Sequence, residues 1–155
     1  IASNLKLGNE KLSKEEMKRV AQISQSLEFI DKKEDGFGGP ISQGGTNVSG
    51  GQKQRLAIAR AIAKNPEIYI FDDSFSALDF KTDAKLRKAL KEYTKDSTIL
   101  IVAQRISSIM NADKIIVLEQ GEVVGMGTHN ELLKNCEVYK EIASSQLGEE
   151  EIKNA

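Results

Sequence analysis

Three short runs in this 155-residue chain carry the residue types that handle phosphate and magnesium. They are Val48-Ser49-Gly50-Gly51-Gln52, the apolar stretch Ile68 to Phe71 followed by Asp72-Asp73, and Ser76-Ala77-Leu78-Asp79. A Ser-Gly-Gly sequence at a helix start can offer backbone N–H groups to an anion, because the first helical turn leaves them without intrahelical partners. A carboxylate at a strand end is a hard oxygen ligand that suits Mg²⁺. The sequence therefore predicts a site for nucleotide phosphates and their magnesium ion.

The loop that normally cradles such phosphates does not occur in these 155 residues, which contain no Gly-x-x-x-x-Gly-Lys-Ser/Thr. The chain begins at Ile1 rather than Met, and we interpret it as a piece cut from a longer protein. By itself it is expected neither to bind nucleotide tightly nor to hydrolyse it.

Composition and charge narrow the class of protein. The net charge is −1, with 39% hydrophobic and 29% charged residues. The sequence therefore lacks the excess of basic residues that is typical of nucleic-acid-binding proteins. No apolar run approaches the roughly 20 residues of a membrane span, and no signal-peptide pattern is present. The single cysteine, Cys136, excludes an internal disulfide and fits a reducing compartment.

Capping signals and periodicity predict the helices that must position the three runs. Ser13 and Glu16 form a capping box, and the apolar spacing after it predicts a helix over 14–27. Lys53 to Lys64 has an apolar face and stops at Asn65-Pro66, which predicts the helix opened by Ser-Gly-Gly. Further helices are expected at 81–93, 106–110, 131–133 and 138–143.

The strands complete a recognisable architecture. Ile68 to Phe71 and Thr98 to Ala103 are continuous apolar runs, the pattern of strands buried on both faces. Lys114 to Glu119 and Glu122 to Met126 flank Gln120-Gly121 and predict a hairpin. Alternating strands and helices predict an α/β fold with a parallel sheet.

Four of these features together resemble the nucleotide-binding domain of ATP-binding-cassette (ABC) transporters. Val48 to Gln52 stands where the family has its Leu-Ser-Gly-Gly-Gln signature, and Ile68 to Asp73 resembles the Walker B strand. Ser76 to Asp79 matches the D-loop, and Ala103-Gln104-Arg105 occupies the place of the switch histidine. Gly127-Thr128-His129 near the end resembles exporter-type domains.

The resemblance implies a fold and a division of the chain. The fold would be the C-terminal portion of a P-loop NTPase (RecA-like) domain: a parallel sheet with flanking helices plus a helical signature subdomain. Residues 1–47 would form the helical subdomain and loop, 48–66 the signature motif and its helix, and 67–147 the C-terminal half of the ATPase core. Residues 148–155 are expected to be a flexible tail.

The resemblance also implies a role for each site residue. Ser49, Gly50, Gly51 and Gln52 would contact the nucleotide held by an opposite domain. Ser76 and Asp79 of the D-loop are also expected to be nucleotide-binding residues, and Asp79 would bridge the two domains. Without that context, an ordinary helix cap is the better explanation of Ser49. A buried carboxylate at the end of the strand is costly without a partner, so Asp72 is expected to orient Mg²⁺. A capping or salt-bridged Asp72 is the alternative.

Two positions depart from the family pattern. Asp73 stands where most active members have the glutamate that polarises the attacking water, and aspartate withdraws the oxygen by about an ångström. Gln104 replaces a histidine that could carry a proton, whereas glutamine can only donate a hydrogen bond. Both changes weaken catalysis, which resembles the degenerate-site subunit of heterodimeric exporters. The alternative is that Asp73 serves as a slower base.

The resemblance implies ATP and Mg²⁺ as cofactors, and as partners a second nucleotide-binding domain and the transmembrane domains of a transporter. The site would lie at the cytoplasmic face of the cell membrane. Two other functions stay open: an ABC-type ATPase of DNA repair or chromosome mechanics, and an inactive structural piece. For His129 a capping or solvent-facing role is favoured over metal ligation.

Overall fold

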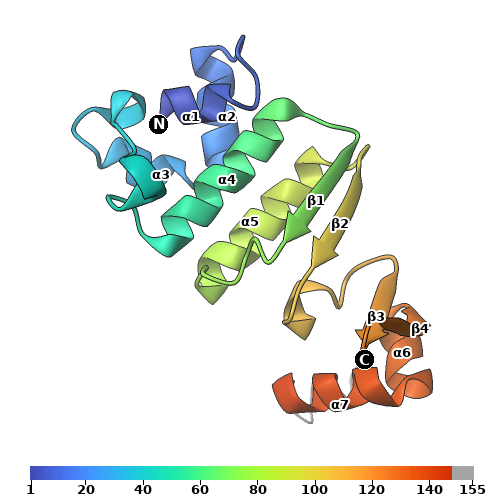
Figure 1. Ribbon diagram of the computed structural model, residues 1–155. Helices are drawn as coiled ribbons and strands as arrows, with labels where there is room; N and C mark the ends of the chain where they lie inside the picture. Colours follow the sequence, from blue (N-terminus) through green and yellow to red (C-terminus); the bar gives the residue numbers. More distant parts are fainter. Residues whose placement is uncertain (148–155) are drawn as a thin grey trace. The chain divides into compact units, whose positions relative to one another are not determined.

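A computed structural model describes residues 1–147 of the chain (Figure 1). The chain divides after Leu100 into two units. None of the described helices combines the length and hydropathy of a membrane span. The expected flexible tail, 148–155, lies outside the described residues.

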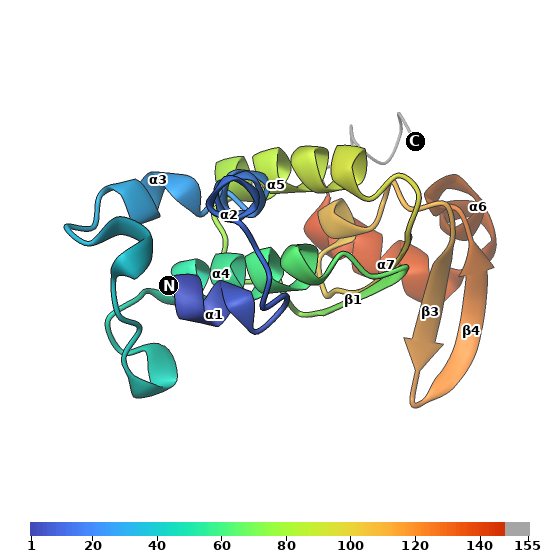
Figure 2. The same cartoon turned by 90° about the horizontal axis from the view of Figure 1, so that it is seen from above.

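The first unit is built around the long helix α4, Gly50–Lys64. Helices α1 (Ala2–Lys6) and α2 (Lys14–Ile23) pack on α4, and α2 also touches α5 (Phe80–Tyr93) (Figure 2). No strand occurs before α4, in residues 1–49. The core contributed by α4 and α5 includes Leu56, Ile58, Ile62, Leu86 and Leu90.

The helix expected over 14–27 is wrong over its last four residues, 24–27. Its capping box is present, with Ser13 Oγ accepting from Glu16 N–H, but α2 ends at Ile23. Gln25 has a φ of 58°, a left-handed conformation that breaks the helix. A separate short helix, α3, then runs over Leu27–Asp31.

Strands β1 (Ile68–Asp72) and β2 (Thr98–Val102) form a two-stranded parallel sheet, which confirms the α/β class (Figure 1). The expectation that both strands are buried on two faces is wrong for this chain. In β1 only Tyr69 and Phe71 are buried, whereas Ile68 and Ile70 are exposed. Leu100 and Val102 of β2 are also exposed. Alternate residues point to opposite faces of a strand, and within the described residues only one face of β1 is covered.

The second unit contains the expected hairpin, β3 (Ile115–Glu119) and β4 (Glu122–Gly127), paired antiparallel. Gln120 and Gly121 have φ values of 51° and 86°, so both positions of the tight turn are left-handed, as its sequence predicts. A bulge between Val117 and Leu118 shifts the register.

Helices α6 (His129–Asn135) and α7 (Glu137–Gln146) cover one face of the hairpin together with a 3-10 turn, η3, at Ile106–Ser108. They are longer than the expected helices 131–133 and 138–143, while η3 is shorter than the expected 106–110. The core of this unit consists of Ile106, Ile115, Val117, Leu132, Cys136, Tyr139 and Ala143.

The expected capping or exposed role of His129 is wrong. Thr128 is the cap residue of α6, and His129 is only 5% exposed. Its Nδ1 lies 2.7 Å from Tyr139 Oη, and its buried Nε2 has no hydrogen-bond partner among the described residues. Burial lowers the pKa of His129 from its ordinary value of 6.5.

This burial predicts a stability that falls in mild acid. Because the folded chain holds its only histidine neutral, the unfolded chain takes up the proton first as pH drops. The free energy of unfolding should therefore be highest above pH 6.5 and fall by at most about 1.4 kcal/mol per pH unit below it. Urea unfolding between about pH 5.5 and pH 7 measures this slope. His129→Gln should flatten it, and an unchanged slope in that variant would contradict the assignment.

Candidate functional site

The signature-like run forms the exposed start of α4. Ser49 is the cap residue, and its Oγ accepts from Gln52 N–H at 3.3 Å. The Gln52 side chain accepts from Ser49 N–H at 3.0 Å, which completes a reciprocal capping box. Buried Val48 anchors the chain just before the cap, while Ser49 and Gly50 stay exposed. The start of a 15-residue helix is therefore fixed in place and open to an approaching group.

Gly51 lies where α4 meets the turn that follows β1. A Cβ atom at Gly51 would stand 2.9 Å from the carbonyl oxygen of Ala77, closer than real Cβ contacts allow. At Gly50 the nearest atom, Ala77 Cβ, would be at an ordinary 3.7 Å. The two glycines therefore differ: only Gly51 is required by a close backbone approach.

The turn after β1 is closed by its own polar groups. Asp73 has a φ of 45°, the left-handed region that aspartate tolerates better than most residues. Ser76 Oγ lies 3.0 Å from Asp73 Oδ2 and 3.2 Å from Asp73 O. The carboxylate proposed to activate water is thus oriented by a hydroxyl of its own turn.

The expectation of a buried carboxylate at Asp72 is wrong, because Asp72 is exposed in the structure. It follows Ile68 and Ile70 on the outward side of β1, and this alternation explains its exposure. An exposed carboxylate remains a suitable Mg²⁺ ligand. Among residues 1–147, no three His, Cys, Asp or Glu side chains converge on a possible metal position.

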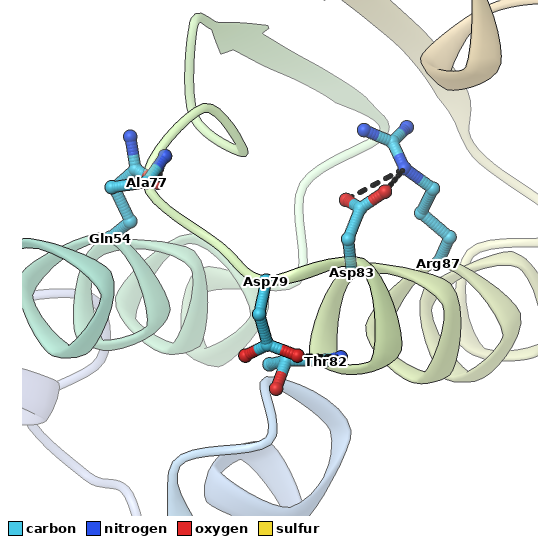
Figure 3. Close-up of polar contacts among 6 residues, drawn as sticks. All are labelled: Gln54, Ala77, Asp79, Thr82, Asp83 and Arg87. Atoms are coloured by element: carbon cyan, nitrogen blue, oxygen red, sulfur yellow. Dashed lines mark hydrogen bonds and ion pairs between the residues drawn. The ribbon is translucent and has the colours of Figure 1, made fainter.

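Gln54 is the residue that the sequence reasoning missed. Its Nε2 donates to Asp73 O and to Ser76 Oγ, both at 3.0 Å, and its Oε1 accepts from Ala77 N–H at 2.9 Å. Figure 3 shows Gln54 reaching from α4 to the backbone at Ala77. The available signal was its position three residues after Gly51, which places both on one face of the helix.

Asp79 begins α5. Its Oδ1 accepts from Thr82 N–H at 2.9 Å, and this backbone hydrogen bond lowers the pKa of Asp79 (Figure 3). The carboxylate therefore stays ionised at the helix start, where the dipole favours a negative charge. Asp79 is exposed, so a second molecule could reach it.

Arg87 of α5 also contacts the turn that follows β1. Arg87 Nε donates to both carboxylate oxygens of Asp83 at 2.9 Å, as Figure 3 shows. The guanidinium carbon of Arg87 lies 4.2 Å from the centre of the Phe75 ring. Phe75, which is buried, sits between Asp73 and Ser76 in the turn. The turn is thus fixed by Gln54 through its polar atoms and by Arg87 through an aromatic ring.

Arg55 ties the start of α4 to the N-terminal helices. Its Nη1 donates to Gln25 O at 2.6 Å, its Nε donates to Gly51 O at 3.3 Å, and its guanidinium lies over the Phe29 ring. Burial lowers the pKa of Arg55. The guanidinium still carries its charge at neutral pH, because arginine is not deprotonated in proteins. The signature-like tip is therefore braced by two neighbouring residues, Gln54 and Arg55, on different sides of α4.

The remaining site residue, Gln104, belongs to the second unit. It is exposed, and its backbone carbonyl accepts from Gln146 Nε2 at 2.8 Å. Gln146 Oε1 also accepts from Ile106 N–H at 2.9 Å, so α7 fixes the backbone that carries Gln104. Gly51, Gln54 and the turn that contains Asp73 and Ser76 come together within the first unit. Gln104 belongs to the second unit.

Known proteins that are similar to this chain include ABC transporter proteins. The ABC transporter family model matches residues 2–76. An uncharacterized ABC transporter ATP-binding protein of Mycobacterium tuberculosis is 45% identical over 149 residues, which are 94% of this chain and 25% of that protein. A Rickettsia felis protein with the description export ATP-binding/permease protein is 42% identical over 147 residues, 95% of this chain and 26% of that protein.

A solved structure supports the same fold. A bacterial Atm1-family ABC exporter with ATP bound matches with a TM-score of 0.91 and 33% sequence identity, covering 96% of this chain and 26% of that one. The chain therefore spans about a quarter of the length of the relatives that it matches.

The different surroundings of the two glycines predict different costs of substitution. Gly51→Ala should reduce the free energy of unfolding by roughly 1–3 kcal/mol, because a methyl group cannot fit against the Ala77 carbonyl without a backbone shift. Gly50→Ala, the matched control, should be neutral or stabilising by up to about 1 kcal/mol. Urea unfolding of both variants measures the difference, and equal effects would show that the close approach is not present.

Proposed function

Because the chain belongs to the ABC transporter family and has the fold of an exporter's nucleotide-binding domain, we propose that it couples ATP binding and hydrolysis to transport across a membrane. The observation that carries the proposal is the exposed helix tip at Ser49, joined through Gln54 to the turn that follows an acidic strand end. These two elements are the ones such a domain uses on ATP, and here they are physically connected.

The tip would act on the nucleotide of a second ATP-binding domain. Ser49 and Gly50 are exposed at the start of α4, where backbone N–H groups and the helix dipole favour an anion. Ser49, Gly50 and Gly51 offer backbone N–H groups and a hydroxyl but no carboxylate for a metal ion, so the remaining phosphate contacts would come from a partner domain. Exposed Asp79 and Ser76 lie on the turn beside it and would meet the same partner.

The chain's own half-site would bind ATP and Mg²⁺ but turn over slowly. Asp72 would hold Mg²⁺ through its exposed carboxylate, and Asp73 would face the attacking water. Two features argue for slow turnover: the short reach of Asp73, whose Oδ2 accepts from Ser76, and the inability of Gln104 to carry a proton. The intact signature would meanwhile serve the competent site of the partner.

The partners in this proposal are a second nucleotide-binding domain and the transmembrane domains of the transporter, with the site at the cytoplasmic face of the membrane. The relative described as an export ATP-binding/permease protein supports a membrane-spanning companion. The 155-residue chain alone would be inactive, since it has no Walker A sequence to hold the phosphates.

Restoring both weakened positions should increase turnover. In the full-length protein with its partner, Asp73→Glu combined with Gln104→His is expected to increase ATP hydrolysis on the order of tenfold to a hundredfold. The steady-state release of inorganic phosphate measures it, with each single substitution as a control. A rate that stays flat in the double variant would refute the weakened-site proposal.

A block at the signature tip should have the opposite effect. Ser49→Arg places a bulky positive group at a helix start that favours anions, and it should reduce ATP turnover of the full-length protein by about tenfold or more. The lost cap itself costs only about 1 kcal/mol of stability, so the protein should remain folded. Ser49→Thr keeps a capping hydroxyl and is the matched control. Undiminished turnover in the arginine variant would exclude a role for this tip in the shared site.

A further inference from the structure

The side-chain amide of Gln54, which is half-exposed, makes three hydrogen bonds within the protein. All three bonds from its amide go to one turn, and they join residues 19, 22 and 23 positions apart in the sequence. Ordering a glutamine side chain costs conformational entropy, so a single exposed bond would contribute little. A fully used amide, with both donor and acceptor occupied, instead fixes the distance between α4 and the turn.

The atoms that Gln54 holds are those that orient the candidate base. Its Nε2 binds the carbonyl of Asp73 and the hydroxyl of Ser76, and that hydroxyl also lies 3.0 Å from Asp73 Oδ2. Asp73 is left-handed, a conformation that persists only where surrounding contacts determine it. Gln54 supplies those contacts from outside the turn.

The same residue lies one helical turn from the signature tip. Gly51, three residues earlier, faces the Ala77 carbonyl, and Gln54 accepts from the Ala77 amide. An α-helix moves as a stiff rod over one turn, so a displacement of the Ser49 tip shifts Gln54 equally. The turn that bears Asp73 would follow it through the three bonds.

We propose that Gln54 is a positioning residue for ATP hydrolysis, which transmits the position of the Ser49 tip to the Asp73 turn. This inference rests on the proposed function and deepens it: the signature tip would report the nucleotide of one site to the acidic turn of the other. Gln54 itself touches no substrate in this scheme. It acts through the backbone of Asp73 and Ala77.

The alternative is that Gln54 only stabilises the fold. The contact of Arg87 with Phe75 allows a stabilising role to be distinguished from a positioning role. Arg87 holds Phe75 from α5, paired with Asp83, so the turn keeps an anchor when Gln54 is removed. Phe75 also packs against Phe71 with ring centres 5.3 Å apart. Loss of the amide should therefore free the polar side of the turn while the aromatic side stays packed.

Two substitutions at this position separate the two hydrogen bonds that Gln54 donates from the one that it accepts. Gln54→Leu keeps the approximate volume and removes all three bonds. Gln54→Glu keeps an acceptor for Ala77 N–H but replaces the donor that faces the Asp73 carbonyl and Ser76. Gln22→Leu, on the exposed surface of α2, is the matched control outside this contact.

The experiment uses the full-length protein with its partner and measures steady-state ATP hydrolysis, thermal unfolding and backbone hydrogen exchange. Gln54→Leu should lower kcat on the order of tenfold with KM for ATP unchanged, because a misplaced group loses rate rather than ground-state binding. The segment containing Ala77 should exchange about tenfold faster, and Tm should stay near that of the Gln22→Leu control. Gln54→Glu should lower kcat while the protection of Ala77 persists.

A wild-type kcat in Gln54→Leu would overturn the inference. So would a loss of kcat that only follows a falling Tm, because that result would make Gln54 a structural residue. Absence of ATP turnover in the wild-type protein would instead refute the proposed function. That measurement is made on the wild-type protein and does not depend on the Gln54 variants. The two failures are therefore distinguishable.

Discussion

The close contact between the start of α4 and the turn after β1 is the constraint on which the candidate site depends. Gly51 lets the Ala77 carbonyl approach to a distance that any side chain would forbid. At that separation the amide of Gln54 spans the gap and satisfies groups on the other side. A glycine thus sets the spacing, and a polar residue one turn later fixes the register. These contacts hold the exposed start of α4 and the acidic turn close together.

Charge in this region is arranged in pairs that compete little with one another. Asp79 is engaged by the first turn of α5, and Asp83 is engaged by Arg87 on the same helix. Arg55 meanwhile is directed toward backbone carbonyls and the Phe29 ring on the other side of α4. With these groups occupied, Asp72 remains the exposed acid at the end of β1. A cation could therefore bind Asp72 without removing Asp79 or Asp83 from its hydrogen-bond partner.

Local signals predicted local features well. The capping box that begins α2, the helix stop at Asn65 and the left-handed Gln120-Gly121 turn depend on a few neighbouring residues, so the sequence contains them. The failures involve surroundings. The continuous apolar run of β1 predicts burial on two faces, but burial depends on which layers are present to cover each face. The left-handed conformation of Gln25 could not be predicted, because no proline or glycine lies next to it in the sequence.

The site shows the same division. The types and order of residues 49–52 and 72–79 are visible in the sequence, whereas the Gln54 contact depends on a helix and a turn about twenty residues apart. His129 likewise stands after a cap residue, where an exposed role is the ordinary expectation, and only tertiary packing buries it against Tyr139. Both residues owe their roles to distant partners, which periodicity cannot report.

The left-handed backbone at position 73 has a consequence for which acid can occupy it. Short polar side chains tolerate a positive φ because they can bond to their own turn, and a longer acid lacks that compensation. Aspartate at this position suits the local geometry, and the same geometry shortens the reach of its carboxylate. Backbone conformation and side-chain length therefore place opposing demands on this residue, and the residue present is one that suits the left-handed backbone.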